Sequence, residues 1–491
     1  MYYVSTRGEG IKKTSQEAIL KGLADDGGLY VPIEIPKLKK SWNELKNYSY
    51  KDISQEILSI YFDDFKEDEL KEILDISYRD KFLNDNIVEI KKCGNDYFLE
   101  LFHGKTLAFK DMALSLMPNM MEFVLKKIQK KGIILVATSG DTGKAALEGF
   151  SAREKIDIAV FYPNEGISEI QRKQMVTQEG DNVKVIGVKG NFDDAQTGLK
   201  KAFLKYKNSN LEDVIISSAN SINIGRLLPQ VIYYYYSYIE LLRRREIWEG
   251  ERINIVVPTG NFGNILAGYY AKLMGLPIKK IICASNENDV LKDFFDTGRY
   301  DIERNFKQTL SPSMDILVSS NLERLIYHVE KDGEKVKAKM ESLKKNNKFE
   351  ISDFFKSNIN EFEAERISDE ETSKYIKKVY DIFEYVIDPH TAVAYGALEK
   401  YKVKTADTTK TIIVSTASPF KFPKTVGSAL GINLKEKSDW DYVDCICEKF
   451  QLEMPNVMKK IREVEVIHND LIEKSEIEYM VDEIIKGSVE R

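Results

Sequence analysis

The sequence predicts an α/β protein in which open parallel sheets carry helices on both faces. Short β-branched runs alternate with longer helical stretches from about residue 130 onwards. The first ninety or so residues lack this alternation and read mostly as amphipathic helix. The length of 491 residues corresponds to about three domains of ordinary size, which leaves room for a separate N-terminal cap.

The predicted N-terminal cap covers residues 1–90. It consists mostly of amphipathic helix, without the alternation of strand and helix seen later in the chain. We expect helices at Gln16–Gly22, Trp42–Leu45, Tyr50–Tyr61 and Glu67–Tyr78.

The central part of the chain contains the predicted strands and helices of the α/β layers. Each β-branched run is bounded by Gly, Pro, Asn or Ser and reads as a buried strand. The expected strands are Ile133–Ala137, Ile156–Tyr162, Val183–Val188, Val214–Ile216, Ile253–Val257, Ile281–Ala284 and Ile412–Val414. The expected helices between them are Asp141–Arg153, Phe192–Tyr206, Ile224–Arg245 and Phe262–Met274.

Two further segments depart from this rhythm. Residues 321–378 are rich in Lys and Glu, and we interpret them as a solvated helical insertion rather than a binding tail. The alternation resumes at Tyr385, and the chain reads as helical and polar again from Trp440, so that residues 431–491 form a C-terminal helical segment.

Composition and charge exclude several classes of protein. The chain has 72 Lys and Arg against 78 Asp and Glu, a net charge of −6, whereas a protein that coats nucleic acid would be basic. The longest apolar runs are too short for a membrane span, and the first residues lack the pattern of a secretory leader. The four cysteines form no C-x-x-C pair and the four histidines form no H-E-x-x-H motif, which argues against disulfides and metal. We therefore expect a cytoplasmic protein with no nucleic-acid partner, membrane contact or metal site.

Two lysine-containing turns resemble phosphate-binding P-loops only in part. Gly104-Lys105-Thr106 has the required ending, but Leu99 stands at the position of the first glycine. Gly143-Lys144 has Thr138 at that position and Ala145 in place of the magnesium-binding hydroxyl. ATP or GTP hydrolysis therefore loses its main support.

The segment Pro258–Asn264 joins a buried strand to a long helix. Its glycines allow close approach to a ligand, and the helix N-terminus favours a phosphate dianion. A tight turn without a ligand explains the same pattern, because the dinucleotide fingerprint needs a third glycine.

The segment Thr138–Gly143 forms a second turn of the same kind. Its amides and the hydroxyls of Ser139 and Thr142 suit a carboxylate. Simple helix capping by Ser139, Asp141 or Thr142 remains the alternative.

Lys110 stands in Thr106–Asp111 among apolar residues and beside an acid. A lysine that loses its charge by desolvation becomes a nucleophilic amine, as a Schiff base requires. A surface lysine that extends its charged end into water is the alternative.

Two other segments carry polar groups suited to anions. Asn220–Arg226 offers amides, a hydroxyl and a guanidinium that can bind phosphate or carboxylate, or else caps a helix. Ser415–Pro419 follows a predicted strand, where ligands collect in open α/β sheets, or else forms an ordinary polar turn.

Together these motifs resemble threonine synthase, specifically the longer form with an N-terminal extension. The resemblance extends over nearly the whole chain. Its motifs are Tyr2–Gly8, Gly22–Pro32, Leu101–Leu114, Ala137–Gly143, Asn220–Gln230, Pro258–Asn264, Ser311–Arg324 and Ser415–Pro423.

The resemblance implies a fold-type II enzyme, similar to the tryptophan synthase β subunit, that uses pyridoxal 5′-phosphate (PLP). It implies a large PLP-binding α/β domain at 91–130 and 236–430 and a small substrate domain at 131–235. Lys110 would hold PLP as a Schiff base, Thr416 would contact the pyridine nitrogen, and Asp141 would lie near the phenolic oxygen. The phosphate loop of the cofactor would consist of Gly260, Asn261, Phe262, Gly263 and Asn264.

The resemblance also implies the reaction, which converts O-phospho-L-homoserine and water into L-threonine and phosphate by γ-elimination and β-addition. The substrate carboxylate would bind at Ser139, Gly140 and Thr142, and its phosphate at Asn220, Asn223 and Arg226. The partner is thus a small-molecule substrate, and the protein would be a monomer or homodimer. A related phospho-lyase and a non-catalytic homologue remain alternatives, although the intact Lys110 argues against the latter.

Two positions depart from the family pattern. Lys105 stands where the family usually has proline, and it either adds charge for the substrate phosphate or faces solvent. Ser418 stands where the family has histidine, with Phe420 in place of the following alanine. These changes bear on fine substrate specificity more than on the cofactor.

Overall fold

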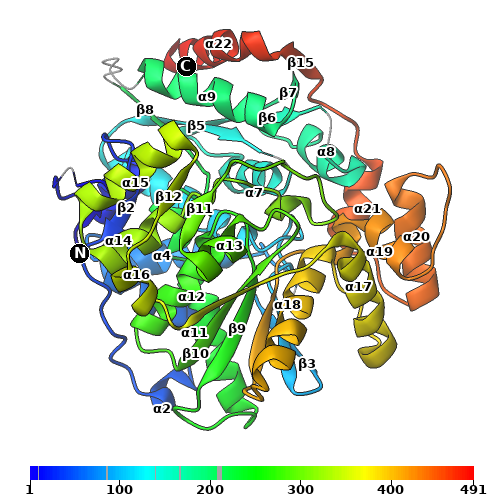
Figure 1. The fold of residues 1–491 in the computed structure, drawn as a ribbon. Coiled ribbons are helices and arrows are strands. Elements are labelled where there is room, and N and C mark those ends of the chain that lie inside the picture. The colour runs from blue at the N-terminus through cyan, green and yellow to red at the C-terminus, as the bar shows by residue number, and fades with distance from the viewer. Residues whose placement is uncertain (9, 84–86, 139, 165–166, 207–212, 491) are drawn as a thin grey trace.

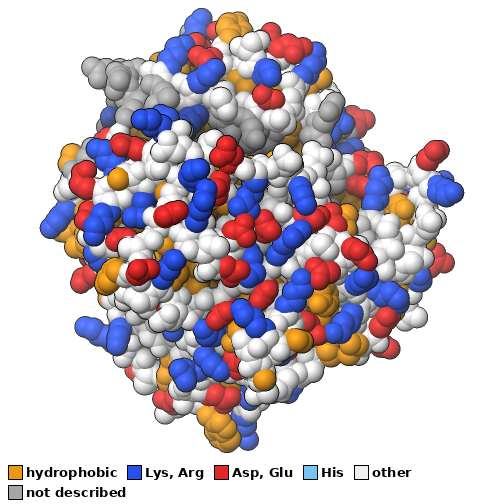
Figure 2. Space-filling view, viewed as in Figure 1, with side chains coloured by type: hydrophobic (Ala, Val, Ile, Leu, Met, Phe, Trp, Pro, Cys, Tyr) orange, Lys and Arg blue, Asp and Glu red, His pale blue; other side chains and the backbone are white. Residues whose placement is uncertain are grey.

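Two parallel sheets organise the chain (Figure 1). The computed structural model describes residues 1–491 except 9, 84–86, 139, 165–166, 207–212 and 491. None of the helices in this described part combines the length and the apolar character that a membrane span requires. Basic and acidic side chains are interspersed over the face shown in Figure 2, consistent with the nearly balanced charge.

The larger sheet has the strand order β13-β10-β9-β14-β4-β3. Its strands are β3 (Glu89–Cys93), β4 (Asp96–Glu100), β9 (Ile253–Pro258), β10 (Ile278–Ser285), β13 (Phe362–Arg366) and β14 (Thr411–Ser415). All neighbours are parallel except β3 and β4. Ile412 and Val414 join one hydrophobic core while Ile413 joins another, so β14 is buried on both faces, as its continuous apolar run predicted.

Helices cover both faces of this sheet. On one face α18 (Pro389–Thr405) packs against β9, β10, β13 and β14, while α12 (Gly263–Leu273) contacts β9 and β10 and packs on α11 (Gln230–Arg243). Three further helices are α5 (Asp111–Leu114), α6 (Met117–Lys127) and α13 (Val290–Thr297).

The smaller sheet is parallel throughout, in the order β15-β7-β6-β5-β8. Its strands are β5 (Lys131–Ala137), β6 (Ile156–Pro163), β7 (Val183–Lys189), β8 (Val214–Ser217) and β15 (Asp470–Glu473). Its helices are α7 (Asp141–Phe150), α8 (Glu169–Val176), α9 (Phe192–Tyr206) and α22 (Ile477–Glu490). Figure 1 shows α22 lying along α9, which brings the end of the chain back to this sheet.

The cap helices lie close to their predicted positions. They are α1 (Ser15–Lys21), α2 (Trp42–Leu45), α3 (Tyr50–Tyr61) and α4 (Glu67–Tyr78). Thr14, Ser41 and Ser49 form capping boxes at the first three, which explains the sharp starts. The cap also contains a short antiparallel pair, β1 (Tyr3–Ser5) and β2 (Tyr30–Pro32), which the sequence analysis did not predict.

The predicted helix Ile224–Arg245 is divided in two. The first part, α10 (Ile224–Leu227), ends just before Pro229, and α11 begins directly after it. Proline has no amide to donate and clashes with the preceding turn, so a continuous helix is disfavoured there.

The prediction of a purely helical insertion at residues 321–378 was wrong in part. It contains α14 (Leu322–Glu330), α15 (Gly333–Asn346), α16 (Asp353–Ser357) and the start of α17 (Asp369–Phe383). However, β12 (Lys348–Glu350) pairs with β11 (Arg299–Asp301), and β13 forms an edge of the larger sheet. The segment thus belongs to the α/β layer that it was expected to interrupt.

The predicted helical segment at the C-terminal end, residues 431–491, is also only partly helical in the structure. It contains α20 (Asp439–Phe450), α21 (Asn456–Glu463) and α22, but β15 adds a strand to the smaller sheet. The remaining helical elements are α19 (Pro423–Ala429) and the 3₁₀ turns η1 (Pro312–Met314), η2 (Pro419–Lys421) and η3 (Lys474–Glu476).

Candidate active site

The loops that follow parallel strands of the two sheets meet in one region. Lys110 and Lys421, from the larger sheet's side, both approach Asp141 at the start of α7. Asn321, at the start of α14, donates to the hydroxyl of Ser221 over 3.3 Å, which joins α14 to the loop after β8. Carboxyl ends of strands in open α/β sheets are where ligands bind, so this junction is the candidate site.

Lys110 and Thr416 are held together by the backbone. Phe109 N donates to Thr416 O over 2.8 Å, and Ser418 N donates to Leu107 O over 3.0 Å. An isolated antiparallel bridge pairs Ala108 with Ala417 between these two bonds. The predicted lysine and the predicted ring-nitrogen ligand therefore share one short ladder.

The ammonium group of Lys110 is largely removed from water. Its side chain is 13% exposed, and Nζ lies 3.7 Å from Oδ2 of Asp141. Burial lowers the pKa of Lys110 to about 8, with the charge of Asp141 opposing the shift and the charges of Arg226 and Lys421 adding to it. A neutral, nucleophilic amine is thus available much nearer to neutral pH than for an exposed lysine.

Asp141 carries a buried negative charge at the centre of the site. Oδ1 accepts a hydrogen bond from Gln171 Nε2 over 2.8 Å and lies 2.9 Å from Lys421 Nζ. Oδ2 accepts from the hydroxyl of Ser313 over 3.2 Å. Burial alone would raise the pKa of Asp141, but the charges of Lys421 and Lys110 outweigh it and hold that pKa well below its usual range.

The turn before α7 is capped by a residue that the sequence analysis did not name as its cap. The hydroxyl of Thr138 accepts from Gly140 N over 2.9 Å and from Gly143 N over 2.8 Å. Gly140 has a φ of 138°, which favours glycine. Thr142 is half-buried there, and the predicted Ser139 lies outside the described residues.

The turn before α12 is built differently. Phe262 adopts the left-handed conformation, with φ at 62°, directly before the first turn of the helix. The Gly260 carbonyl accepts from the Ser319 hydroxyl over 2.6 Å, and the Asn261 carbonyl accepts from the side chain of Asn321 over 2.8 Å. Two carbonyls of the turn are thereby occupied, and the first amides of α12 have no earlier helical turn to bond.

Asn264, in the first turn of α12, leaves a donor for a bound anion. Its Oδ1 accepts from the hydroxyls of Tyr233 and Tyr234, each over 2.6 Å. Its Nδ2 is buried and has no hydrogen-bond partner among the described residues. An unsatisfied buried donor at a helix N-terminus fits a phosphate group, so these residues suit the phosphate of PLP.

Arg226 is a second buried cation with unused donors. Its residue is 3% exposed, and one guanidinium nitrogen donates to Ala219 O over 2.6 Å. Its Nε and the Oδ1 of Asn220 have no partner among the described residues, and burial lowers the pKa of Arg226 to about 10. A buried guanidinium without a carboxylate partner suits an anionic ligand.

Asn223 has a different use. Its Oδ1 accepts from Gly225 N over 2.9 Å, and its Nδ2 donates to Ile19 O and Ser218 O over 2.8 and 3.2 Å. Both ends of the side chain are committed to capping α10 and to holding the cap helix α1.

Two residues that the sequence analysis did not single out support the site. His390 interacts through Nδ1 with Asp388 over 2.7 Å and accepts through Nε2 from Ser313 N over 3.1 Å. Lys421 contacts Asp141 directly. Lys421 stands between Phe420 and Phe422, and Lys110 likewise follows a phenylalanine, a signal that could have found Lys421.

Arg324 joins the loop after β8 to the N-terminal cap. The sequence analysis did not single it out either. It is fully buried and donates to Tyr30 O over 2.9 Å and to Ile222 O over 2.6 Å, and it also contacts Asn321. Nothing local in the sequence distinguishes it from a solvated arginine on a helix.

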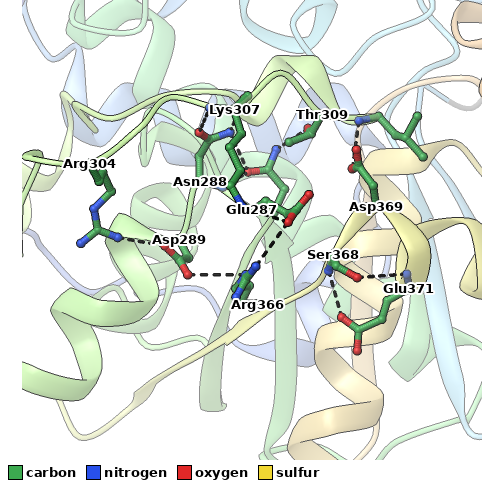
Figure 3. Close-up of polar contacts among 12 residues, drawn as sticks. Glu287, Asn288, Asp289, Arg304, Lys307, Thr309, Arg366, Ser368, Asp369 and Glu371 are labelled. Atoms are coloured by element: carbon green, nitrogen blue, oxygen red, sulfur yellow. Dashed lines mark hydrogen bonds and ion pairs between the residues drawn. The ribbon is translucent and has the colours of Figure 1, made fainter.

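The segment that leads to Ser313 is fixed by a polar network (Figure 3). Asn288 accepts from Lys307 N over 3.0 Å and donates to Lys307 O over 2.9 Å. Asp369 accepts from Leu310 N over 3.0 Å. In Figure 3, ion pairs continue this network outward through Arg304, Asp289, Arg366 and Glu287. These contacts determine where Ser313 lies relative to Asp141.

The two departures from the family pattern have local roles. Lys105 is 40% exposed and its Nζ lies 3.4 Å from Glu148. Ser418 is buried and its hydroxyl accepts from Phe420 N over 3.4 Å, which begins the turn that carries Lys421.

Comparison with known proteins gives a consistent result over the whole chain. Family models match for the threonine synthase N terminus at residues 2–78, for pyridoxal-phosphate dependent enzymes at 88–417, and for the threonine synthase C-terminal region at 391–477. Threonine synthase from Schizosaccharomyces pombe is 39% identical, covering 87% of this chain and 89% of that one.

Solved structures agree with this comparison. The crystal structure of threonine synthase from yeast has a TM-score of 0.88 and 34% identity, covering 99% of each chain. PLP-bound threonine synthase from Brucella melitensis has a TM-score of 0.85 and 35% identity, also covering 99% of each chain. The expected fold-type II architecture and PLP dependence are thereby confirmed, and the chain belongs to the threonine synthase family of pyridoxal-phosphate-dependent enzymes.

Proposed function

We propose that the site converts O-phospho-L-homoserine and water into L-threonine and phosphate. Membership of the threonine synthase family supports the reaction. The observation that carries it is the buried Lys110 beside Asp141, with separate unsatisfied donors at Asn264 and Arg226. A phosphorylated substrate and a phosphorylated cofactor need two anion sites, and this chain offers two.

The cofactor is assigned to the larger sheet's side of the site. Lys110 would hold PLP, and Gly260, Asn261, Phe262, Gly263 and Asn264 would bind its phosphate at the start of α12. When bound, PLP supplies an electron sink for negative charge at the substrate Cα. The hydroxyl of Thr416 would contact the ring nitrogen as a neutral group and so moderate that sink. Asp141 would contact the phenolic oxygen.

The substrate is assigned to the smaller sheet's side. Thr142 and the undescribed Ser139 would bind its carboxylate, Gly140 would shape the turn with its amide bonded to Thr138, and Arg226 with Asn220 would bind the phosphate. Because the hydroxyl of Thr138 already occupies two amides of the first turn, the carboxylate would use the remaining donors. We assign Asn223 to holding the loop rather than to direct contact, since its side chain is fully bonded.

Lys110 is the group suited to move protons. With a pKa of about 8, its amine can accept a proton from the substrate Cα near neutral pH and release it later. The low pKa of Asp141 means that this carboxylate stays ionised and does not compete for the proton. The atoms balance when the protons taken from Cα and Cβ return to Cα and Cγ, the hydroxyl of water bonds to Cβ, and the second proton of water goes to the phosphate that leaves Cγ.

Product analysis tests this proposal. Purified PLP-loaded protein is incubated with O-phospho-L-homoserine, and phosphate and amino acids are quantified over time. Equal amounts of phosphate and threonine are expected, and Lys110→Ala should lose both products and the visible absorbance band. Release of 2-oxobutyrate without threonine would instead indicate the phospho-lyase, and no release of phosphate would contradict both reactions.

A further inference from the structure

Lys421 is a completely enclosed cation. Its side chain has no exposed surface. Lys421 lies in the η2 turn, shortly after Thr416, the residue predicted to contact the ring nitrogen of PLP. Its Nζ donates to Thr106 O over 2.8 Å and to Gln174 Oε1 over 3.0 Å, and it lies 2.9 Å from Asp141 Oδ1. An ammonium group has three donors, so every donor of Lys421 has a partner. It therefore has no donor left for a ligand.

Asp141 presents different partners at its two oxygens. Lys421 and Gln171 occupy Oδ1, whereas Oδ2 faces Lys110 and the hydroxyl of Ser313. The carboxylate is thus fixed from one side by residues that do not face the reacting atoms. The other oxygen, Oδ2, faces Lys110.

We infer that Lys421 is a positioning residue that holds Oδ1 of Asp141 in place and adds a positive charge beside the Lys110–Asp141 pair. The inference rests on the proposed function of Lys110 as the cofactor lysine. A carboxylate paired with Lys110 alone would lose its partner whenever Lys110 loses its charge. Lys421 is a second lysine beside the same carboxylate, so Asp141 keeps a buried partner even when Lys110 is neutral, and a buried charge left without a partner is costly.

Other charged groups face this pair. Arg226 acts on Lys110 from α10 and has no carboxylate partner among the described residues. On the other side of Lys421 lie Asp111, whose pKa is raised by burial to about 6, and Lys144, whose pKa is lowered by burial. The charges that act directly on Lys110 are those of Asp141, Arg226 and Lys421.

The sign of the expected effect follows from Coulomb's law. A nearby cation disfavours a proton on the Lys110 nitrogen, whereas a nearby anion favours it. Removing Lys421 should therefore raise the pH at which that nitrogen loses its proton, and removing the charge of Asp141 should lower it. A merely structural role for Lys421 predicts lower stability without a change in this pH.

The test titrates the visible absorbance band of the PLP-loaded protein against pH. Lys421→Met should move the midpoint upward by about one unit, the scale typical of a charge within a few ångströms. Lys421→Arg keeps the charge and should restore most of the midpoint. Lys105→Met removes a lysine whose Nζ pairs with Glu148 instead, and its midpoint should match the unsubstituted protein. An unchanged midpoint in Lys421→Met would overturn the inference.

Asp141→Asn keeps the test decisive if Lys421→Met does not fold. This variant should move the midpoint downward, and the double variant Lys421→Met with Asp141→Asn should lie below Lys421→Met wherever both can be measured. The inference is supported if Asp141→Asn moves the midpoint downward and Lys421→Arg stays near the original midpoint. It is overturned if Asp141→Asn does not move the midpoint. A separate result would contradict the proposed function: a Lys110→Ala protein that retains the visible absorbance band.

Discussion

The turns that begin α7 and α12 follow parallel strands and look alike in sequence, but their threonine hydroxyls make different hydrogen bonds. Each starts with threonine and contains two glycines. In the first, the hydroxyl of Thr138 accepts from two backbone amides. In the second, the hydroxyl of Thr259 donates to Val257 O over 2.7 Å and leaves the amides alone.

The difference explains which charge each turn carries. The first turn commits two of its amides to Thr138 and carries Asp141, an anion that pairs with two lysines. The second turn keeps its donors and carries Asn264, whose amide is unsatisfied. A helix N-terminus therefore offers an anion only those amides that the local side chains leave unused.

The largest expected effect comes from breaking the first turn's charge pair. Asp141→Ala would leave Lys421 as an unpaired buried cation, which should lower the free energy of unfolding by about 3–5 kcal/mol. Denaturant unfolding measures the change. Asp381→Ala removes an exposed carboxylate 2.9 Å from Lys377 and should cost less than about 1 kcal/mol. Similar losses in the two variants would contradict the role of Asp141 as the buried partner of Lys421.

A smaller effect is expected on substrate binding. Arg226→Ala should raise KM for O-phospho-L-homoserine by about 10- to 100-fold, because a charge-assisted hydrogen bond contributes about 1.5–3 kcal/mol. The dissociation constant of PLP should change by about twofold or less, as expected for an independent site. Steady-state kinetics and equilibrium dialysis measure the two. Equal weakening of both ligands would remove Arg226 from the substrate site.

Alanine at one glycine in each turn sharpens the contrast. A Cβ on Gly260 would lie 3.0 Å from Ser313 O, so Gly260→Ala should weaken PLP binding about tenfold, within the usual cost of overpacking. A Cβ on Gly140 would lie 2.7 Å from Gln171 Nε2, and Gly140→Ala should lower kcat more than cofactor affinity. Fluorescence titration with PLP and initial rates distinguish them. The reverse pattern would show that the turns were assigned the wrong way round.

The smallest effect compares the two threonines. Thr138→Val removes the acceptor of two amides and should lower the free energy of unfolding by about 1–2 kcal/mol. Thr259→Val removes a donor to one carbonyl and should cost less, about 0.5–1 kcal/mol. Urea unfolding of both variants measures the difference. If Thr259→Val were the more damaging change, the capping role of Thr138 would not hold.

Much of the fold could be predicted from the sequence. The β-branched runs and the amphipathic helical patterns act within a few residues, so α2, α3, α4 and α9 have their predicted bounds. The short strands β13 and β15 were missed because each completes a sheet whose other strands lie far away in the chain. Among Lys- and Glu-rich neighbours, their local pattern does not differ from helix.

The predicted site residues divide in a similar way. Lys110, Asp141, Asn264 and Arg226 were named from local motifs, and the structure brings Lys110, Asp141 and Arg226 within electrostatic reach of one another. His390, Arg324 and Lys421 were missed because their partners come from distant elements. Asn223 was named as a ligand, but its contacts with Ile19 and Ser218 appear only after folding.

The sequence by itself determined the alternation of strand and helix, the two glycine-containing turns, the lysine that we propose holds the cofactor, and the family, because these depend on motifs of residues close together in the chain. Only the tertiary structure decided how charge is distributed among them. Whether a buried lysine is a nucleophile or a fixed counter-charge depends on whether its donors are satisfied. Lys110 has one carboxylate nearby, whereas Lys421 is enclosed by Thr106, Gln174 and Asp141 from separate segments. Desolvation and hydrogen bonding at that scale exist only once the two sheets have come together.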